Sequence, residues 1–429
     1  MRLTVEDAEE ALVHADQSLV PGTARTALAH PDFRRLYFGA FGSNIGSWMQ
    51  NAVLGAYAFT LTGSATFVGV ITFAQLGPLL LLSVIGGALA DQFDRRRLLL
   101  AVAVEQLGFS LAIAWLTRAD DPSRVALVLL VLAIGAGQAV HAPTYSAVLP
   151  GLVGRRDLAG AISLNSVQMN ASRVVGPAIG GVLFAAFGAP WVFALNAATY
   201  LAVIGVLLTM RFPSLDSGNE PEGLRRVLGG FRVVRDNQVV RRCLGTMIVF
   251  SLLCLPFVVQ MPTVAARNLG VQPDSAAYGV LYACLGLGAV IGSLAIGTVL
   301  AAVPKRHIVP VGLSGFALAV AALALLRDPA PAYPVAVLVG ICYFGTVTSL
   351  STVLQERLDD RVRGRVMALW IMSFGGTVPI GGLLAGPAIE ATSVTTVMLT
   401  GAAVAALLAG WVRLITARPA ARGTSPGSP

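Results

Sequence analysis

Charged residues are scarce in this sequence. Only 12% of its 429 residues are Asp, Glu, Lys or Arg, whereas 55% are hydrophobic. A soluble protein of this length would carry about twice that charged fraction, so the composition excludes a soluble enzyme or binding domain. Apolar runs of about 20 residues recur instead along nearly the whole chain, and each is long enough to cross a bilayer core as a helix. The sequence therefore predicts an all-α polytopic membrane protein.

Cysteine is also rare, and nucleotide-binding and catalytic motifs are missing. The four cysteines lie singly in apolar runs without a CxxC pair, so we expect neither a disulfide framework nor a metal site. The sequence contains no GxxxxGK[ST] phosphate loop and no His-x-x-x-His pair. We therefore expect no cofactor, no metal and no enzymatic activity.

The distribution of basic residues predicts the topology. Thirty basic residues face 22 acidic ones, and Lys305 is the only lysine. They are spread among short loops, which is the positive-inside pattern of a membrane protein and not the surface of a nucleic-acid-binding domain. The loops expected outside hold only Arg118, Arg124, Arg267 and Arg327. With an even number of spans, this asymmetry places both termini in the cytoplasm and the protein in the plasma (inner) membrane.

Twelve transmembrane helices in two halves of six are expected. The N-terminal six-helix bundle covers residues 37–210, and the C-terminal bundle covers residues 240–416. Between them, residues 211–239 are expected to form a cytoplasmic linker with a basic amphipathic helix. Residues 1–36 are interpreted as a cytoplasmic tail and residues 417–429 as a disordered cytoplasmic tail.

An internal repeat supports the two halves. The fifth span reads Gly-Pro-Ala-Ile-Gly-Gly over residues 176–181, and the eleventh reads Val-Pro-Ile-Gly-Gly over residues 378–382. The offset is about 200 residues, half of the chain. Proline and small residues make a membrane helix bendable and allow close packing, so we interpret the motif as a hinge, with ordinary small-residue packing as the alternative. The predicted hinge residues are Gly176, Pro177, Gly180, Gly181, Pro379 and Gly382.

A short charged hairpin joins the second and third spans. It reads Gly-Ala-Leu-Ala-Asp-Gln-Phe-Asp-Arg-Arg-Arg over residues 87–97. Ion pairs across such a turn and to a neighbouring span could form in one conformation and break in another, which is the behaviour of a gate. The alternative is charge that only holds the loop inside, although that role needs no carboxylate. The predicted gate residues are Gly87, Asp91, Arg95, Arg96 and Arg97.

These motifs resemble those of the major facilitator superfamily. The hairpin is similar to the signature between its second and third spans, and residues 176–181 are similar to the fifth-span motif of its antiporter branch. Residues 32–36, 46–50 and 170–177 further resemble a subgroup of bacterial exporters that includes enterobactin and macrolide efflux proteins. The resemblance covers residues 30–416 and implies the major facilitator fold and transport out of the cell.

The sequence departs from the superfamily pattern in three places. Asp94 replaces the usual glycine of the hairpin, and Gln92 replaces a usual basic residue. The matching loop of the second half, residues 292–306, lacks the aspartate. The fourth span lacks the intramembrane arginine that drug/proton antiporters of the superfamily commonly carry, which brings the usual route of proton coupling into question.

Three ionisable residues are expected inside the spans. An ionisable residue at the bilayer centre costs about 2.5–3.5 kcal/mol on insertion scales and therefore needs a reason. Glu105 could carry a proton or make a gate-side hydrogen bond, and His141 could carry a proton or be a satisfied bundle residue. Arg173 could pair with Glu105, bind an anionic substrate group or make a structural hydrogen bond. We assign Glu105, His141 and Arg173 to proton or charge coupling, whereas Glu390 is interpreted as a solvated helix end.

Neutral polar residues outline a possible substrate cavity. On the first span, Asn44, Ser47 and Asn51 share one helical face. An amphipathic substrate would meet apolar walls with a few amides there. The alternative is hydrogen bonding between helices, worth about 0.6 kcal/mol per bond, and we expect this role at about half of the positions. The candidate cavity residues are Asn44, Gln50, Asn51, Gln75, Gln138, Gln168 and Gln260.

The sequence predicts a secondary active exporter of a small amphipathic or hydrophobic molecule, such as a drug-like compound or a siderophore, driven by proton antiport. An importer or metabolite transporter of the same fold is the alternative. A membrane sensor or enzyme is a weaker one, because polar segments of about 30 residues are too short for a typical soluble domain. The expected partners are the substrate, protons and the lipid bilayer, without nucleic acid, and the protein is expected to be a monomer.

Overall fold

The computed structural model describes residues 22–210, 234, 235, 237–356, 358 and 360–416. All regular elements within these residues are helices. The first half contains α2 (Ala24–Ala29), α3 (Pro31–Thr62), α4 (Ala65–Gln92), α5 (Arg95–Leu116), α6 (Arg124–Phe187) and α7 (Ala189–Thr209). The second half contains α9 (Gln238–Val249), η1 (Phe250–Cys254), α10 (Pro256–Val259), α11 (Met261–Leu269), α12 (Ala276–Gly297), α13 (Lys305–Leu325), α14 (Pro329–Gln355), α15 (Asp360–Ile371), η2 (Met372–Gly376), α16 (Thr377–Ala391) and α17 (Val394–Thr416).

Three of the long helical segments are interrupted. Helix α6 is 64 residues long and breaks at Gly154, where φ is 71° and ψ is 170°. That backbone region is essentially restricted to glycine, and the break makes α6 two spans. One turn of π-helix interrupts the span from α9 to α11, and another interrupts the span from α15 to α16. Eight described helices are long and apolar enough to cross a membrane by length and composition alone. With α6 counted twice and the interrupted spans included, the predicted twelve-helix fold is confirmed.

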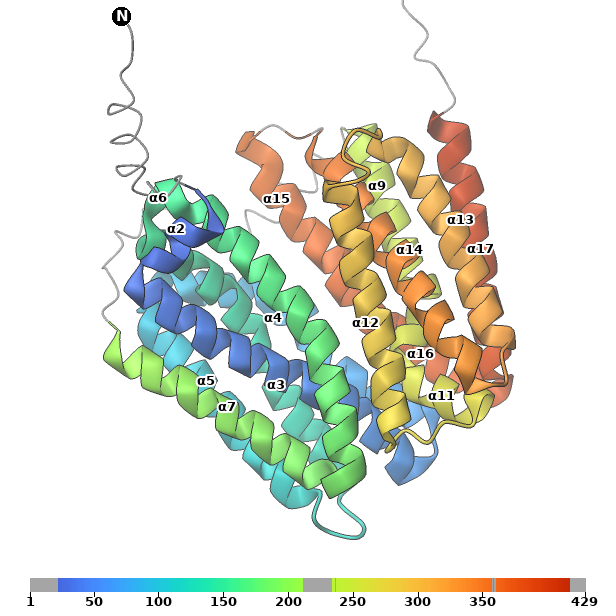
Figure 1. Ribbon diagram of the computed structural model, residues 1–429, viewed down its shortest axis with the longest axis horizontal. Coiled ribbons are helices and arrows are strands. Elements are labelled where there is room, and N and C mark those ends of the chain that lie inside the picture. The colour runs from blue at the N-terminus through green and yellow to red at the C-terminus, as the bar shows by residue number, and fades with distance from the viewer. Residues whose placement is uncertain (1–21, 211–233, 236, 357, 359, 417–429) are drawn as a thin grey trace, which may run out of the picture.

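The spans form two bundles that lie side by side (Figure 1). The bundles approach each other at the lower end of Figure 1 and diverge at its upper end. We call the end with Arg95, Arg155 and Lys305 the basic end, and the end with Gly63 and Arg267 the closed end. The apolar core is continuous across both bundles, and a second apolar cluster fills the basic end of the first bundle.

Two pairs of helices carry the main contacts between the bundles, α6 with α12 and α4 with α16. Glycines allow the backbones to approach closely at both crossings. A Cβ added to Gly279 would lie 2.6 Å from the Cα of Gly181, and one added to Gly69 would lie 2.7 Å from the carbonyl oxygen of Gly382. Small residues at helix crossings are a common means of close packing in membranes. The two bundles are therefore joined backbone to backbone towards the closed end.

A short segment before the first span is docked on the turn of α6. Asp157 lies in the connection that follows Gly154, outside the membrane-spanning parts of α6. Its carboxylate accepts hydrogen bonds from the backbone N–H of Gly22 at 3.0 Å and from His30 Nε2 at 2.9 Å. These bonds, with one from Thr26, stabilise the ionised form and lower the pKa of Asp157 to about 2. The contact holds α2 against the basic end.

Replacing Asp157 with asparagine is expected to loosen α2. Because the pKa of Asp157 lies below its ordinary value of 3.8, the carboxylate stabilises docking above about pH 4 and loses this effect as the pH falls through about 2. At neutral pH, the backbone amides of residues 24–29 should therefore exchange hydrogen several-fold faster in Asp157→Asn than in the wild type, as measured by mass spectrometry. Asp274→Asn, a change at an exposed loop carboxylate, is the matched control, and equal exchange in both variants would contradict the prediction.

Candidate functional site

The charged hairpin is bound to its own half of the molecule. Arg95 Nη1 donates a hydrogen bond to the carbonyl oxygen of Ala147 on α6 at 3.1 Å. Arg96 donates to the carbonyl oxygens of Leu207 at 2.7 Å and Leu208 at 2.6 Å. These two carbonyls lie in the last turn of α7, where helix carbonyls lack intrahelical partners and positive charge is favoured. The arginines thus connect the hairpin to α6 and α7.

Asp94 caps the helix that follows the hairpin. Its Oδ1 accepts a hydrogen bond from the backbone N–H of Arg97 at 2.8 Å, and it occupies the N-cap position of α5. This capping role gives a physical reason for an aspartate where the superfamily pattern has glycine. The side chain of Arg97 is exposed. The predicted gate residues Gly87 and Asp91 belong to the last part of α4, and their surroundings lie outside the described part of the structure.

The predicted hinge residues lie where helices cross. Gly176 faces α3, since a Cβ there would lie 2.7 Å from the Cβ of Trp48. Gly180 faces the same helix, and a Cβ there would lie 2.9 Å from the Cγ of Met49. The remaining residues of this set are buried on α6 and α16, the helices that join the bundles: Pro177, Gly181, Pro379 and Gly382.

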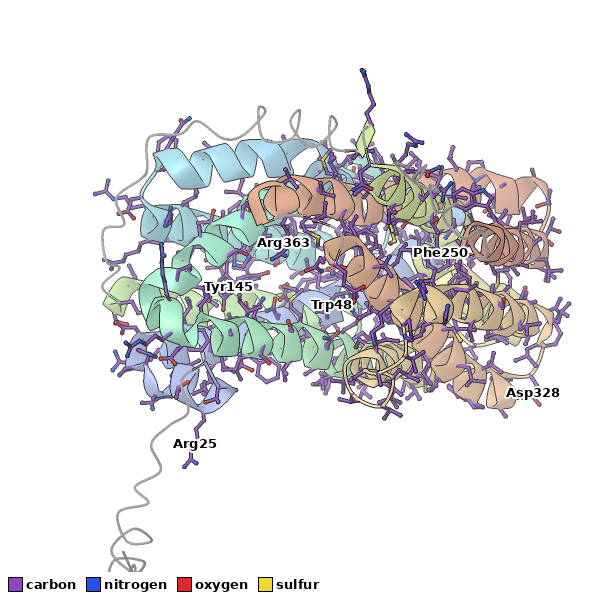
Figure 2. All side chains as sticks on the ribbon, turned by 90° about the horizontal axis from the view of Figure 1, so that it is seen from above. Arg25, Trp48, Tyr145, Phe250, Asp328 and Arg363 are labelled. Atoms are coloured by element: carbon purple, nitrogen blue, oxygen red, sulfur yellow. The ribbon has the colours of Figure 1, made fainter. Side chains whose placement is uncertain are left out.

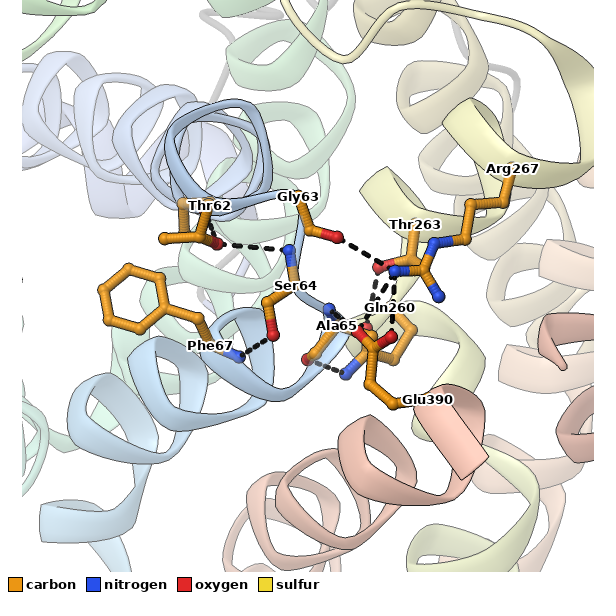
Figure 3. Close-up of polar contacts among 10 residues, drawn as sticks. Thr62, Gly63, Ser64, Ala65, Phe67, Gln260, Thr263, Arg267 and Glu390 are labelled. Carbon is orange, nitrogen blue, oxygen red and sulfur yellow. Dashed lines mark hydrogen bonds and ion pairs between the residues drawn. The ribbon is translucent and has the colours of Figure 1, made fainter. Parts of the chain in front are cut away.

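A polar cluster seals the closed end (Figure 3). Arg267, in the last turn of α11, donates to both carboxylate oxygens of Glu390 on α16 at 3.1 Å, and to the carbonyl oxygen of Gly63 at 2.9 Å. Glu390 also accepts a hydrogen bond from the backbone N–H of Ala65 at 2.7 Å. Gly63 and Ala65 belong to the turn between α3 and α4, so two charged side chains of the second half hold a turn of the first half. We call Arg267, Glu390 and residues 63–65 the latch.

Gln260 extends the latch into the protein interior. It is 1% exposed, and its Nε2 donates to the carbonyl oxygens of Ala65 at 2.9 Å and Gly382 at 3.4 Å. This amide, predicted for a substrate cavity, therefore lies in the sealed contact and joins α4, α11 and α16. Glu390, which the sequence places at a solvated helix end, has a side chain that is 38% exposed, and it also pairs with Arg267.

A chain of hydrogen bonds runs through the first bundle. Gln106 on α5 is 2% exposed, and its Nε2 donates to Glu105 Oε2 and to the carbonyl oxygen of Ile134, both at 2.8 Å. Its Oε1 accepts a hydrogen bond from the hydroxyl of Tyr200 at 3.4 Å. The same hydroxyl lies 2.9 Å from Ser47 Oγ. The chain connects α3, α5, α6 and α7.

A small cavity opens beside this chain. Its lining includes the predicted residues Asn44, Gln138 and His141, and also Gln106 and Tyr145. The rings of His141 and Tyr145 are stacked with their centroids 5.7 Å apart. The other walls are mainly apolar side chains of α3, α5 and α7. The structure thus brings three of the predicted residues into one cavity of the first bundle.

Glu105 belongs to the same polar chain. One of its carboxylate oxygens, Oε2, accepts the bond from Gln106, whereas Oε1 is buried without a hydrogen-bond partner among the described residues. The carboxylate packs directly against Gly137 on α6, where a Cβ would collide with it. The ion pairs of the described residues do not include Glu105. An ionised carboxylate at this place lacks the partners that a buried charge requires.

Arg173 lies between the two bundles and not beside Glu105. The central carbon of its guanidinium is 4.8 Å from the ring centroid of Trp48 on α3 and 4.5 Å from that of Phe344 on α14. Seen from the basic end, Trp48 lies near the middle of the molecule, between the bundles (Figure 2). The pairing with Glu105 that the sequence left open does not occur, and a double cation–π contact takes its place.

Comparison with known families decides the classification. A family model described as transmembrane secretion effector matches residues 23–424. The chain belongs to this family. The family is a branch of the major facilitator superfamily, so the resemblance seen in the motifs is confirmed. The protein is therefore a multi-pass membrane transporter of the secretion effector family.

Relatives and solved structures agree with this classification. The chain is similar to the enterobactin exporters EntS of Salmonella typhimurium and of Escherichia coli O1:K1, with 28% identity to each over 80% of this chain and 81% of the relative. Its fold resembles that of the nucleoside transporter NupG (TM-score 0.71, 15% identity, 90% of this chain and 99% of that one). It also resembles a bacterial homolog of the human lysosomal transporter Spinster in an inward-facing, unoccupied conformation (TM-score 0.70, 16% identity, 90% and 97%).

Several of the predicted cavity amides join helices of this secretion effector family protein. Gln50 accepts a hydrogen bond from Asn196 Nδ2 at 2.8 Å, and Gln75 donates one to Asn51. Gln168 is fully buried, and its amide has no hydrogen-bond partner in the part of the chain that the structure describes. Asn44 and Gln138 are the members of the predicted set that line the cavity of the first bundle.

Some residues of the site were not predicted. Gln106 and Tyr200 are polar residues inside apolar runs, and Gln106 follows Glu105 directly, which was the available signal. Arg267 and Glu390 were not predicted as partners because 123 residues separate them. The aromatic partners of Arg173 come from two different halves, and no local pattern connects them.

Proposed function

We propose that this protein exports a small amphipathic molecule by proton antiport, with alternating access between its two bundles. The observation that carries the proposal is the asymmetry of the bundle contact, which is sealed by the latch at the closed end and diverges at the basic end. We assign the basic end to the cytoplasm, with both termini there, because arginine-rich loops remain on that side of a membrane. This conformation would then accept substrate from the cytoplasm.

The relatives support export as the direction and suggest the substrate class. Those that match about four fifths of the chain are named exporters of enterobactin, so a siderophore or a drug-like compound of similar character is the proposed cargo. The hairpin Asp91 to Arg97 is proposed to act as the cytoplasmic gate when that side closes. The protein is proposed to work as a monomer, because each half supplies its own bundle and the pathway lies between the halves.

Glu105 is the proposed proton site. Its Oε1 is buried and has no hydrogen-bond partner among the described residues, whereas its Oε2 accepts a hydrogen bond from Gln106. Gln106 connects through Tyr200 to Ser47, and Gln106, Tyr200 and Ser47 all line the cavity of the first bundle. A proton that binds at Glu105 would therefore reorganise hydrogen bonds at the cavity wall, where His141 offers a second proton acceptor. This chain of hydrogen bonds would couple proton binding at Glu105 to substrate binding in the cavity.

Proton antiport can be tested in everted membrane vesicles. After an inside-acidic gradient is imposed, catecholate siderophores, macrolides and hydrophobic cations are added in turn while a pH-sensitive dye is monitored. We expect one class to cause proton release, and Glu105→Gln to reduce that release at least about a hundredfold, the lower end of the loss typical of a removed proton-transfer group. Substrate binding to the purified variant should lose its pH dependence, because glutamine keeps the shape and one hydrogen bond of the side chain but cannot take up a proton.

Glu356→Gln is the matched control, since Glu356 is exposed at the basic end and its charge change is the same. Proton release that persists in Glu105→Gln would contradict the proton site. Substrate accumulation driven in the opposite direction would contradict export and favour the import alternative, which the fold permits because a D-xylose-proton symporter is also similar in structure (TM-score 0.70).

A further inference from the structure

Within the part of the chain that the structure describes, the guanidinium of Arg173 has aromatic rings as partners but no hydrogen-bond acceptor. Rings of Trp48 and Phe344 lie 4.8 and 4.5 Å from its central carbon. Among the described residues, Arg173 takes part in no ion pair, and no side-chain hydrogen bond is made by it. The side chains of Arg173, Trp48 and Phe344 are each partly exposed. None of these three residues is fully buried, and the N–H groups of Arg173 are left for a partner from outside the chain.

The position of Arg173 is central to the transporter. It lies on α6 where that helix crosses α12, because a Cβ on Gly286 would come 2.8 Å from the carbonyl oxygen of Arg173. Its two aromatic neighbours belong to opposite halves, Trp48 to the first and Phe344 to the second. Tyr282 of α12 and Tyr343 of α14 lie within electrostatic reach of the guanidinium. Residues from both bundles thus surround one cation at the contact between them.

The rings satisfy only part of what this cation needs. A cation–π contact contributes about 0.5–2 kcal/mol. An arginine near the bilayer centre costs about 2.5–3.5 kcal/mol on insertion scales, and the cost is larger for an arginine without partners. The contacts with the rings are electrostatic attractions to the charge of the guanidinium, and they leave its N–H donors without acceptors. Those donors form a planar fork that matches the two oxygens of a carboxylate or a comparable oxyanion. An uncharged or cationic ligand offers no such match.

We propose that Arg173 binds an acidic group of the transported molecule, so that the substrate is an organic anion with a carboxylate or phenolate group. This inference rests on the proposed function and narrows it. The phenol hydroxyls of Tyr282 and Tyr343 add further donors near the anion. Because the ligand meets residues of both halves, its binding is sensed by both bundles at once.

The charge preference can be measured with three ligands that share one ring system. These are 2-naphthoate, 2-naphthamide and 2-naphthylmethylammonium, which are anionic, neutral and cationic. Binding to the purified full-length protein in nanodiscs of zwitterionic lipid is followed by calorimetry and by the midpoint of thermal unfolding. We expect 2-naphthoate to bind at least about tenfold more tightly than the other two, equivalent to one charge-assisted contact.

Variants test whether Arg173 carries that preference. In Arg173→Gln the three ligands should bind within about twofold of one another, and Arg173→Lys should recover part of the preference, because it keeps the charge but not the fork. Arg118→Gln is the matched control, since Arg118 also lies over a tryptophan ring, that of Trp115 at 5.6 Å, but on an exposed loop. The control should retain the wild-type preference. Equal binding of the three ligands by the wild type, or an undiminished preference in Arg173→Gln, would overturn the proposal.

A second arm separates a soluble anion from a lipid headgroup. The unfolding midpoint is measured again in nanodiscs that contain phosphatidylglycerol. If that lipid stabilises the wild type but not Arg173→Gln, and 2-naphthoate has no such effect, Arg173 is a lipid site and the substrate assignment is overturned.

The vesicle assay distinguishes this inference from the proposed function. Arg173-dependent binding of 2-naphthoate without proton-coupled flux of any tested compound would sustain the anion site and refute the antiport. Proton-coupled export of a cation that is undiminished in Arg173→Gln would refute the anion site and sustain the antiport.

Discussion

The variant Gly181→Leu is expected to slow transport strongly while leaving the protein inserted and folded. Gly181 on α6 meets Gly279 on α12 backbone to backbone, and a Cβ at either glycine would overlap the main chain of the other. No flexible side chain can move aside there, so a leucine would hold the two bundles apart at the closed end. Overpacking of this kind costs about 1–3 kcal/mol, and a barrier raised by that amount would slow transport roughly 5- to 150-fold.

The separation of the bundles can be measured directly. Spin labels at positions 119 and 274, in a variant whose four cysteines are replaced by alanine, report the distance between the halves at the closed end. In Gly181→Leu that distance should increase and transport should fall. Gly205→Leu is the matched control, because a Cβ at Gly205 meets nothing within 4 Å and the helix surface there is exposed. Wild-type transport by Gly181→Leu would show that the cycle does not require this contact.

Removal of the Glu390 carboxylate is expected to shift the protein towards the conformation in which the bundles separate at the closed end. Glu390 accepts hydrogen bonds from Arg267 and from the backbone of Ala65. Hydrogen bonds to charged groups contribute about 1.5–3 kcal/mol each, and water screens this pair because its side chains are 35% and 38% exposed. A net loss of about 1.4 kcal/mol would change the ratio of the two conformations about tenfold. Glu390→Gln, which keeps an acceptor for Ala65, should shift less than Glu390→Ala.

The same pair of spin labels measures this shift. Arg267→Gln should shift the distance distribution in the same direction as Glu390→Gln, and the double variant should add little, because both changes remove one interaction. Glu356→Gln, at the basic end, serves as the charge control and should leave the distribution unchanged. Strictly additive effects of the Arg267 and Glu390 variants would show that the two side chains act separately and that the latch is not a unit.

Some parts of the site could be predicted from local sequence patterns, whereas others depend on contacts between residues far apart in the chain. The repeated Pro-x-x-Gly motif was recognised from residues 176–181 and 378–382, and the structure places its two copies on the helices that join the bundles. The roles of the amides were harder to predict. Gln138 lines a cavity, Gln50 bonds to Asn196, and Gln260 is enclosed in the sealed contact. An amide in an apolar run shows that a polar partner is needed but does not identify the partner.

The sequence by itself determined the twelve helical spans, the two related halves and the basic character of one end. It could do so because a bilayer allows few structures besides helices to cross it, and because charge bias follows topology. Only the tertiary structure decided that Arg173 meets Trp48 and Phe344 instead of Glu105, and that Glu390 meets Arg267. A helix that is apolar on nearly every side carries little signal for its rotation about its own axis. That rotation is set by the close packing of backbones at glycine crossings such as Gly181 with Gly279, between residues far apart in the chain.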